Sequence, residues 1–264
     1  MDFFAGIDAG STYVKAVIIN ENKDMIENKI LPSGVDAGLT AKSLMEELTG
    51  KISISVQDIK KIISTGYSRR LIENAHENVT EIRAHAAGSL QTAPGDADIR
   101  TIIDIGGQDS KVIVIDETGN TKNFVMNDKC AAGTGRFLES MARVLEISVA
   151  QIGPLSLQAT NPCRINSICA VFAESEIISL LARKKKPVDI IAGIHNSLAK
   201  RIAGMARSAR METDILVTGG GGLNPGLVAA FEEELLTDIY VPENPQLNGA
   251  IGAALLAADS KAAL

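Results

Sequence analysis

The sequence predicts an α/β fold built from two similar halves, and three observations lead to this prediction. A succession of strand, Asp-Gly turn, strand, strand and helix occurs twice along the chain. The segments that carry the two turns, GIDAGSTYVKAVII and DIGGQDSKVIVID, resemble each other and lie about 100 residues apart, as in a weak internal repeat. The 264 residues, 45% of them hydrophobic, suffice for one large or two modest cores. We therefore expect two duplicated α/β domains that face each other across a cleft.

The first half begins with three strands, the first two of which flank a glycine turn at residues 8–12. Apolar side chains at helical spacing then predict a helix, because Ala41, Leu44, Met45 and Leu48 fall on one face. The expected strands are residues 3–7, 13–20, 25–31 and 60–64, and the expected helices are residues 40–48 and 81–91.

The second half repeats this order and adds helices. Its expected strands are residues 101–105, 111–116, 121–126 and 215–218. Its expected helices are residues 134–146, 170–183 and 188–209. Two further helices are expected, one that is opened by Asn224-Pro225 and a last one that begins near Asn248. We place the first domain at residues 1–98, completed by a C-terminal helix at 246–260. The second domain is placed at residues 99–245 and contains the two cysteines that precede predicted helices, Cys130 and Cys169.

Composition excludes several classes of partner. The net charge is −6, and the one basic cluster, residues 183–186, ends a predicted helix, where cations complement the helix dipole. We therefore expect no nucleic acid and no membrane as a partner. The start of the chain has no basic leader, and no apolar stretch approaches the ~20 residues of a membrane span. A cytoplasmic location is expected, in which three cysteines do not form a disulfide framework.

The first glycine turn has the chemistry of a phosphate site. Backbone N–H groups and hydroxyls at Gly10, Ser11 and Thr12 can bind phosphate oxygens where glycine allows close approach. Asp8 can hold Mg²⁺, directly or through water, and Lys15 can neutralise phosphate charge if its side chain turns inward.

The second turn repeats these residue types. Its phosphate-binding candidates are Gly106, Gly107, Gln108 and Lys111, its second metal carboxylate is Asp104, and Gln108 is also the candidate that orients attacking water. A third glycine run, Gly219, Gly220 and Gly221, lets an adenine lie against bare backbone. An Asp-Gly turn can also do no more than reverse the chain between the two strands of a hairpin. Two matched turns together with a third glycine run favour nucleotide binding. No P-loop or Rossmann motif is present in the sequence.

This layout resembles the superfamily of actin, Hsp70 and the sugar kinases. That superfamily clasps ATP with two hairpin turns from duplicated domains and with an adenosine motif of the VTGGG type, which stands at residues 217–221 of this chain. The resemblance implies ATP or ADP in a cleft between the domains.

Two cysteines, Cys130 and Cys169, each precede an amphipathic helical stretch. A helix N-terminus favours thiolates, because its N–H groups are unpaired and carry partial positive charge. Thr134 is expected to cap the helix after Cys130. Zinc is disfavoured, since no C-x₂-C pair exists and His76, His85 and His195 lie at no characteristic spacing from the cysteines. Buried unliganded thiols are the structural alternative. A [4Fe–4S] cluster takes four thiolates, which two chains on a two-fold axis would supply together.

The segments NDKCAAGTGRFLE and CAVFAESEIIS resemble signature segments of the BadF/BadG/BcrA/BcrD ATPases, the activators of (R)-2-hydroxyacyl-CoA dehydratases and ATPase subunits of benzoyl-CoA reductases. GIDAGSTYVKAVI, IDIGGQDSKVI, IIAGIHNSLAKRI and NGAIGAALLA match as well, so the resemblance runs from end to end. It differs at Ser68, where glycine is expected, and at Cys163, which is outside the pattern and is interpreted as a packed thiol.

By this resemblance, Cys130 and Cys169 each supply one ligand per subunit to a single [4Fe–4S] cluster shared by a homodimer. Gly133 joins the ATP-binding residues, with Mg²⁺ at Asp8 and Asp104. The resemblance further implies that ATP hydrolysis drives an electron, received from ferredoxin or flavodoxin, to a partner iron–sulfur dehydratase, benzoyl-CoA reductase or double-cubane cluster protein.

Two other functions stay open from the residues alone. A sugar or N-acetylhexosamine kinase shares the expected ATP fold, although the sequence contains no distinctive sugar-binding segment. A nucleotide-dependent assembly protein that polymerises like actin is the non-enzymatic alternative, in which the cysteines at helix starts have no purpose.

Overall fold

The computed structural model describes residues 1–95, 97–166 and 169–259, and within them the chain forms two compact units. The first unit comprises residues 1–93, the hairpin tip 115–121 and the described residues from 246 onwards. The second comprises residues 94–114 and 122–245. Each unit contains one five-stranded sheet among the described residues.

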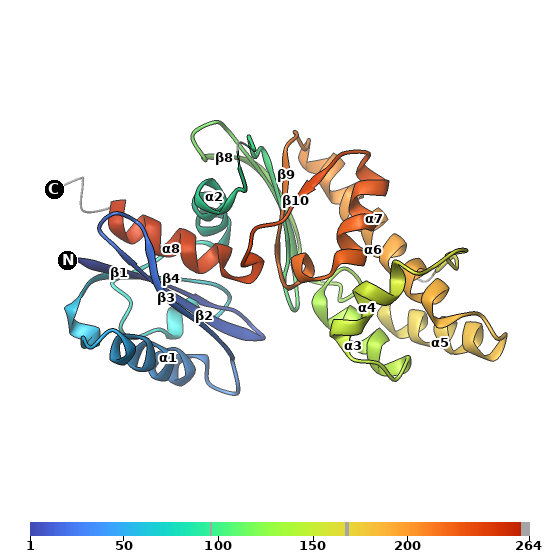
Figure 1. Cartoon of the computed structure of the whole chain (residues 1–264), viewed down its shortest axis with the longest axis horizontal. Helices are drawn as coiled ribbons and strands as arrows, with labels where there is room; N and C mark the ends of the chain where they lie inside the picture. Colours follow the sequence, from blue (N-terminus) through green and yellow to red (C-terminus); the bar gives the residue numbers. More distant parts are fainter. Residues whose placement is uncertain (96, 167–168, 260–264) are drawn as a thin grey trace. The chain divides into compact units, whose positions relative to one another are not determined.

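The first unit is a sheet with helices on both faces (Figure 1). Its strands are β1 (Phe3–Ala9), β2 (Tyr13–Asn20), β3 (Met25–Pro32), β4 (Ile59–Thr65) and β5 (Glu77–Asn78), and its helices are α1 (Ala37–Lys51), α2 (Glu81–Thr92) and α8 (Asn248–Asp259). Alternate side chains of β1 point to opposite faces. Ile7 packs in a core with Leu44 of α1, whereas Phe4 packs in a second core with Ala250 of α8.

The second unit has the same sheet order and a larger helical layer. Its strands are β6 (Thr101–Ile105), β7 (Ser110–Ile115), β8 (Thr121–Asn127), β9 (Ile215–Gly219) and β10 (Ile239–Tyr240), and its helices are α3 (Gly135–Val144), α4 (Val149–Ser156), α5 (Ala170–Ala182), α6 (Pro187–Ala209) and α7 (Pro225–Leu235). A core of β6, β7 and β9 side chains, with Ile103 and Val217 among them, packs with Leu198 of α6 and Phe231 of α7.

The two sheets share one topology, which confirms the predicted duplicated α/β organisation. The strand orders are β3-β2-β1-β4-β5 and β10-β9-β6-β7-β8, the second being the first read in reverse with each strand replaced by its counterpart. In each sheet the first strand pairs antiparallel with the second and parallel with the fourth.

Most expected elements are present, with displaced ends. The helix predicted over residues 134–146 stops at Val144, and a separate helix, α4, follows it. Sequence patterning missed α4, which contains Pro154, and the two-residue strands β5 and β10, which are too short to show periodicity. The predicted end of the C-terminal helix, at position 260, lies outside the described residues. No helix in the described part of the chain is long and apolar enough to cross a membrane.

Candidate functional site

The first glycine turn joins β1 and β2 in the first unit and carries an ion pair. Asp8 is 6% exposed, and its Oδ2 lies 2.8 Å from Lys15 Nζ. The two residues are cross-strand neighbours in the β1–β2 register. The Lys15 side chain does turn inward, but it meets Asp8. A phosphate group at this turn would therefore compete with Asp8 for the ammonium.

The second glycine turn joins β6 and β7 in the second unit and also carries a buried lysine. Lys111 Nζ lies 2.7 Å from Asp109 Oδ1 and 3.6 Å from Asp104 Oδ2. Asp104, 4% exposed, also accepts a hydrogen bond of 2.9 Å from the hydroxyl of Thr218. The exposed side chain of Gln108 lies at the surface of the turn, within the same unit.

Each candidate metal carboxylate has a Thr-Gly pair beside it that sequence reasoning did not connect with it. Thr65 is the parallel partner of Asp8 on β4, and Thr218 is the parallel partner of Asp104 on β9. The next residues, Gly66 and Gly219, have positive φ angles of 94° and 75°. A Cβ at either glycine would lie within 3 Å of the neighbouring aspartate Oδ1. The signal that identifies them is a Thr-Gly pair at the end of a parallel strand.

Buried hydroxyls without partners lie at both turns. Among the described residues, the buried side-chain oxygens of Thr12, Thr65 and Ser110 have no hydrogen-bond partner. Unsatisfied buried polar groups are uncommon in folded proteins and call for an explanation. An added phosphate or a hydrated cation would satisfy them, and the carboxylate oxygens of Asp8 and Asp104 are the donors that Mg²⁺ prefers. The residues present thus fit Mg²⁺ with a nucleotide.

The third glycine run follows β9 in the second unit. Gly220 is exposed and Gly221 is buried, in a short 3₁₀ turn that precedes α7. A Cβ on Gly221 would lie 2.5 Å from Cβ of Ile105, so the run packs directly on β6. Asn224 caps α7, as the sequence predicted, by accepting a hydrogen bond from Leu227 N–H.

Cys130 lies in the loop between β8 and α3, and its surroundings correct two predictions. The Thr134 hydroxyl donates to the Ala131 carbonyl and does not cap α3 with its side chain. The first N–H groups of α3 are not free for a thiolate. Gly135 N donates to the Gly106 carbonyl at 2.8 Å, and Arg136 N donates to the Gly107 carbonyl at 2.9 Å. The N-terminus of α3 is therefore hydrogen-bonded to the second glycine turn.

A cation stands beside Cys130 instead. The guanidinium Nη1 of Arg201, on α6, lies 3.6 Å from Cys130 Sγ, within the distance of a hydrogen bond to sulfur. The amide of Asn127 donates to the Cys130 carbonyl and accepts from its N–H. Gly133 is packed against the same residues, because a Cβ there would lie 3.1 Å from both Asn127 and Arg201.

The other two cysteines differ from each other in exposure. Cys169 is exposed and is the N-cap residue of α5, with no side-chain capping bond, as predicted from its position before the helix. Cys163 is buried in the core of the second unit, and burial raises the pKa of its thiol. The interpretation of Cys163 as a packed thiol is confirmed.

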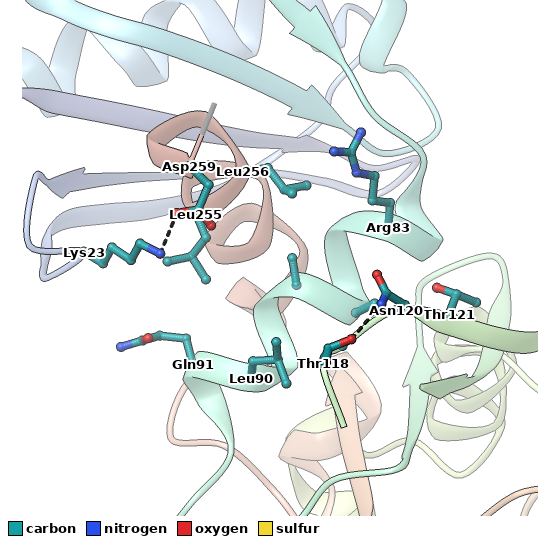
Figure 2. Close-up of a pocket in the computed structure, with 13 residues that line it drawn as sticks. Lys23, Arg83, Leu90, Gln91, Thr118, Asn120, Thr121, Leu255, Leu256 and Asp259 are labelled. Carbon is teal, nitrogen blue, oxygen red and sulfur yellow. Dashed lines mark hydrogen bonds and ion pairs between the residues drawn. The ribbon is translucent and has the colours of Figure 1, made fainter. Parts of the chain in front are cut away.

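Two cavities accompany these residues. A cavity of about 490 Å³ in the second unit is lined by both Gln108 and Cys130, so the second turn and the cysteine loop share one surface. Another cavity, of about 460 Å³, lies between α2, α8 and the turn at 118–121 of the first unit, and Figure 2 shows the side chains that line it. A Lys23–Asp259 ion pair of 2.6 Å stands at this second cavity, and no glycine-turn residue named above lines it.

Sequence reasoning also missed a histidine near Asp8. His85 of α2 is buried, and its ring is hydrogen-bonded by the side-chain amide of Asn248 at 3.2 Å. A Cβ on Gly249 would lie 3.1 Å from His85 Nε2 and 3.3 Å from Asp8 Oδ2. The histidine and the carboxylate therefore face one small space, which residue spacing could not indicate.

The described residues contain no group of three or more His, Cys, Asp or Glu side chains placed to hold a metal ion. One chain offers Cys130 and Cys169 as accessible thiols and keeps Cys163 in its core. Thiolates are the usual cluster ligands, and two per chain are half of the four that a [4Fe–4S] cluster takes. The donor set of one chain thus fits half of a shared cluster.

The fold is shared with known ATP-binding proteins. The chain superposes with a TM-score of 0.92 and 41% identity on the activator of the 2-hydroxyisocaproyl-CoA dehydratase from Clostridium difficile with bound ADPNP, covering 99% of this chain and 96% of that one. It also superposes with a TM-score of 0.58 on a ROK family glucokinase from Streptomyces griseus, at 14% identity and with 97% and 99% coverage, a likeness of fold alone. The predicted fold, that of the actin, Hsp70 and sugar-kinase superfamily, is confirmed.

Sequence relatives point to one family. The chain is 42% identical over 253 residues to the (R)-2-hydroxyglutaryl-CoA dehydratase activating ATPase of Acidaminococcus fermentans, covering 96% of this chain and 95% of that protein. It is 32% identical over 268 residues to a subunit of the benzoyl-CoA reductase of Thauera aromatica, with 97% and 93% coverage. The model of the BadF/BadG/BcrA/BcrD ATPase family matches residues 5–257. This chain belongs to the BadF/BadG/BcrA/BcrD ATPase family.

Proposed function

We propose that this protein is an ATP-driven one-electron donor that activates a partner iron–sulfur enzyme. In this proposal two copies of the chain share one [4Fe–4S] cluster, held by Cys130 and Cys169 of each. The partner is an enzyme of the class that related activators serve, a 2-hydroxyacyl-CoA dehydratase or a benzoyl-CoA reductase, or a double-cubane cluster protein. Ferredoxin or flavodoxin supplies the electron, and the location is cytoplasmic.

The hydrolytic half of the proposal uses the two turns and the third glycine run. Gly10, Ser11, Thr12 and Lys15, with Gly106, Gly107, Gln108, Lys111 and Gly133, bind the phosphates, while Gly219, Gly220 and Gly221 lie against the adenosine. Asp8 and Asp104 hold Mg²⁺, directly or through water. Gln108 orients the water that attacks the terminal phosphate, and the products are ADP and phosphate.

The observation that carries the proposal is the pair of hydrogen bonds between α3 and the second turn. The Gly106 and Gly107 carbonyls accept from the first N–H groups of α3, and Cys130 is five residues before that helix. A change in the turn on binding or losing a phosphate therefore moves the α3 N-terminus and the adjoining cysteine loop. When bound, the cluster supplies the one-electron step.

Exposed apolar side chains beside Cys169 support a second copy as the neighbour. Val171 and Phe172, in the first turn of α5, are 71% and 69% exposed, and Ile178 follows on the same helix at 54%. Contiguous exposed apolar residues mark interaction surfaces. A two-fold axis near these residues would place two copies of Cys169 side by side.

We propose residues 1–98, completed by the C-terminal helix at 246–260, as the first ATPase domain and residues 99–245 as the second. A sugar or N-acetylhexosamine kinase remains the alternative function, which has only the likeness of fold to a glucokinase in its favour.

The test is iron and acid-labile sulfide in protein purified without oxygen, with the EPR spectrum after dithionite reduction. We expect about four irons and four sulfides per dimer. Absence of iron after attempted reconstitution, together with phosphorylation of a sugar from a panel, would replace the proposal with the kinase.

Variants locate the ligands. Cys130→Ser and Cys169→Ser should each remove the iron and leave a folded protein that binds Mg-ADP. Cys163→Ser is the matched control and should keep the iron, because its thiol is buried in the core. Unchanged iron content in Cys130→Ser would refute the ligand assignment.

A further inference from the structure

Three helices of the second unit meet at a buried histidine that the proposed chemistry does not use. His195 of α6 is 1% exposed, and its polar neighbours are Ser156 of α4 and Asn224 at the start of α7, at 7% and 9%. His195 Nδ1 lies 3.0 Å from Ser156 Oγ, and His195 Nε2 lies 3.0 Å from Asn224 Nδ2. The three side chains form one closed polar chain inside an apolar layer.

The direction of every hydrogen bond in this chain follows from one fixed donor. Leu227 N–H can only donate, so the oxygen of the Asn224 amide faces it, at 3.0 Å. The amide nitrogen therefore faces His195, whose Nε2 must accept, and the ring proton lies on Nδ1. Nδ1–H donates to Ser156 Oγ, and the Ser156 hydroxyl donates to the Gly153 carbonyl at 2.8 Å. With His195 in the neutral Nδ1–H tautomer, the side chains of His195, Asn224 and Ser156 each have a hydrogen-bond partner.

Two glycines, Gly153 and Gly226, lie beside the polar chain at positions where a side chain would collide with it. A Cβ on Gly226 would lie 1.8 Å from Ser156 Oγ and 3.0 Å from His195 Nδ1. A Cβ on Gly153 would lie 2.6 Å from Asn224 Oδ1. Both glycines permit the close approach of α4 and α7 that the polar chain requires. Burial lowers the pKa of His195 to about 4, which keeps the ring neutral.

The polar chain ends at the third glycine run. Asn224 directly follows the 3₁₀ turn Gly220–Leu223, and its own N–H donates to the Gly221 carbonyl at 3.1 Å. Consecutive glycines have more backbone freedom than any other residues, so a ligand that needs them in one conformation must bear the cost of ordering them. An asparagine held from both sides fixes the end of the run in advance.

We propose that His195 is a positioning residue for the adenosine of the bound nucleotide: through Asn224 it holds Gly219, Gly220 and Gly221 in the conformation against which the adenosine lies. This inference rests on the proposed nucleotide function. His195 does not contact the ligand, and its contribution is confined to the adenosine end of the nucleotide.

The experiment compares Mg-ADP with Mg-tripolyphosphate, which lacks the adenosine, as ligands in titration calorimetry of anaerobic protein. Asn224→Asp keeps an acceptor for Leu227 N–H but places a carboxylate oxygen opposite His195 Nε2. The ring proton must then move to Nε2, and the Ser156 hydroxyl must leave the Gly153 carbonyl to donate to Nδ1. We expect its Kd for Mg-ADP to rise about tenfold, which is about 1.4 kcal/mol, and its Kd for Mg-tripolyphosphate to stay within twofold.

Two further variants separate positioning from general destabilisation. Ile191→Val removes one buried methyl group from α6, one helical turn before His195, and should reduce stability by about 0.5–1.5 kcal/mol without changing either Kd. His195→Gln retains an amide oxygen for Asn224 and should keep Mg-ADP affinity, whereas His195→Leu should lose it as Asn224→Asp does.

The outcomes are distinct. Equal weakening of both ligands in Asn224→Asp, or a loss of Mg-ADP affinity in Ile191→Val as large as that in Asn224→Asp, overturns the positioning role and leaves the proposed ATPase function intact. A wild-type protein that binds neither ligand overturns the proposed function and this inference together. If Asn224→Asp does not fold, the pair His195→Gln and His195→Leu decides the question.

Discussion

The two glycine turns have the same plan but different pairing of charges. In each unit an aspartate is the last residue but one of the first strand, with a lysine opposite it on the antiparallel neighbour and a threonine on the parallel neighbour. In the first unit Lys15 lies 2.8 Å from Asp8, and the Thr65 hydroxyl has no partner among the described residues. The second unit differs in both respects.

In the second unit the lysine is nearest to a carboxylate of the turn itself. Lys111 lies closer to Asp109 than to Asp104, and Thr218 donates to Asp104. Tyr13 stands at the position of the first turn that corresponds to Asp109. The additional carboxylate, that of Asp109, is therefore the nearer ion-pair partner of Lys111. A phosphate at either turn would therefore compete with carboxylates for the lysine, with Asp8 at the first turn and with both Asp104 and Asp109 at the second.

The largest difference should appear when each lysine is removed. Lys111→Met removes the buried ammonium beside Asp104 and Asp109, and we expect the free energy of unfolding to fall by about 3–5 kcal/mol, as when a buried pair is broken. Lys15→Met should cost about 1–2 kcal/mol, because the Lys15 side chain is 18% exposed against 2% for Lys111 and water screens the single remaining charge. Urea unfolding followed by circular dichroism measures both, and equal losses would contradict the comparison.

Gln108 and Thr12 occupy corresponding positions in the two turns, and their variants should distinguish an effect on the rate of ATP hydrolysis from an effect on nucleotide affinity. Gln108→Ala should lower the rate of phosphate release at saturating ATP about 100-fold, the scale of a positioned group that assists proton transfer. Thr12→Ala, at the corresponding position, should weaken Mg-ATP binding about tenfold through one lost hydrogen bond and leave the saturated rate nearly unchanged. If both variants alter only affinity, Gln108 does not orient the water.

The threonines beside the two carboxylates give the next contrast. Thr218→Val removes a buried hydrogen bond to a charged group, for which we expect a loss of about 1.5–3 kcal/mol. Thr65→Val should change stability by less than about 0.5 kcal/mol, since it replaces an unsatisfied hydroxyl with a methyl group of similar size. Chemical denaturation without nucleotide tests the pair. A large loss in Thr65→Val would mean that its hydroxyl has a partner in solution.

The remaining contrast concerns pH and belongs to the second unit. The pKa of His195 is lowered by burial to about 4 from an ordinary value of 6.5, so below pH 6.5 the unfolded chain takes up a proton that the folded chain does not. Stability is complete above pH 6.5 and falls as pH decreases towards 4, by about 2 kcal/mol at pH 5. His195→Gln should remove this part of the pH dependence. An equally steep decline in that variant would assign it to other groups.

Local sequence patterns were sufficient for most of the fold. The strand predicted at residues 101–105 is β6 without change, and the strand at 13–20 is β2, because runs of Ile and Val favour strands wherever they lie. Pro187 and Asn224 mark helix starts by their own backbone and side-chain chemistry. These signals lie within a few residues of the elements that they define.

The sequence by itself determined the two turns, the third glycine run and the cysteines before helices, because glycine, aspartate and cysteine carry that chemistry locally. The tertiary structure alone decided which distant groups meet them. Thr218 reaches Asp104 across a parallel pair of strands, the α3 N–H groups meet the Gly106 and Gly107 carbonyls, and His195 meets Asn224 from another helix. Partners far apart in the chain leave no periodic pattern, since their proximity depends on strand register and helix packing.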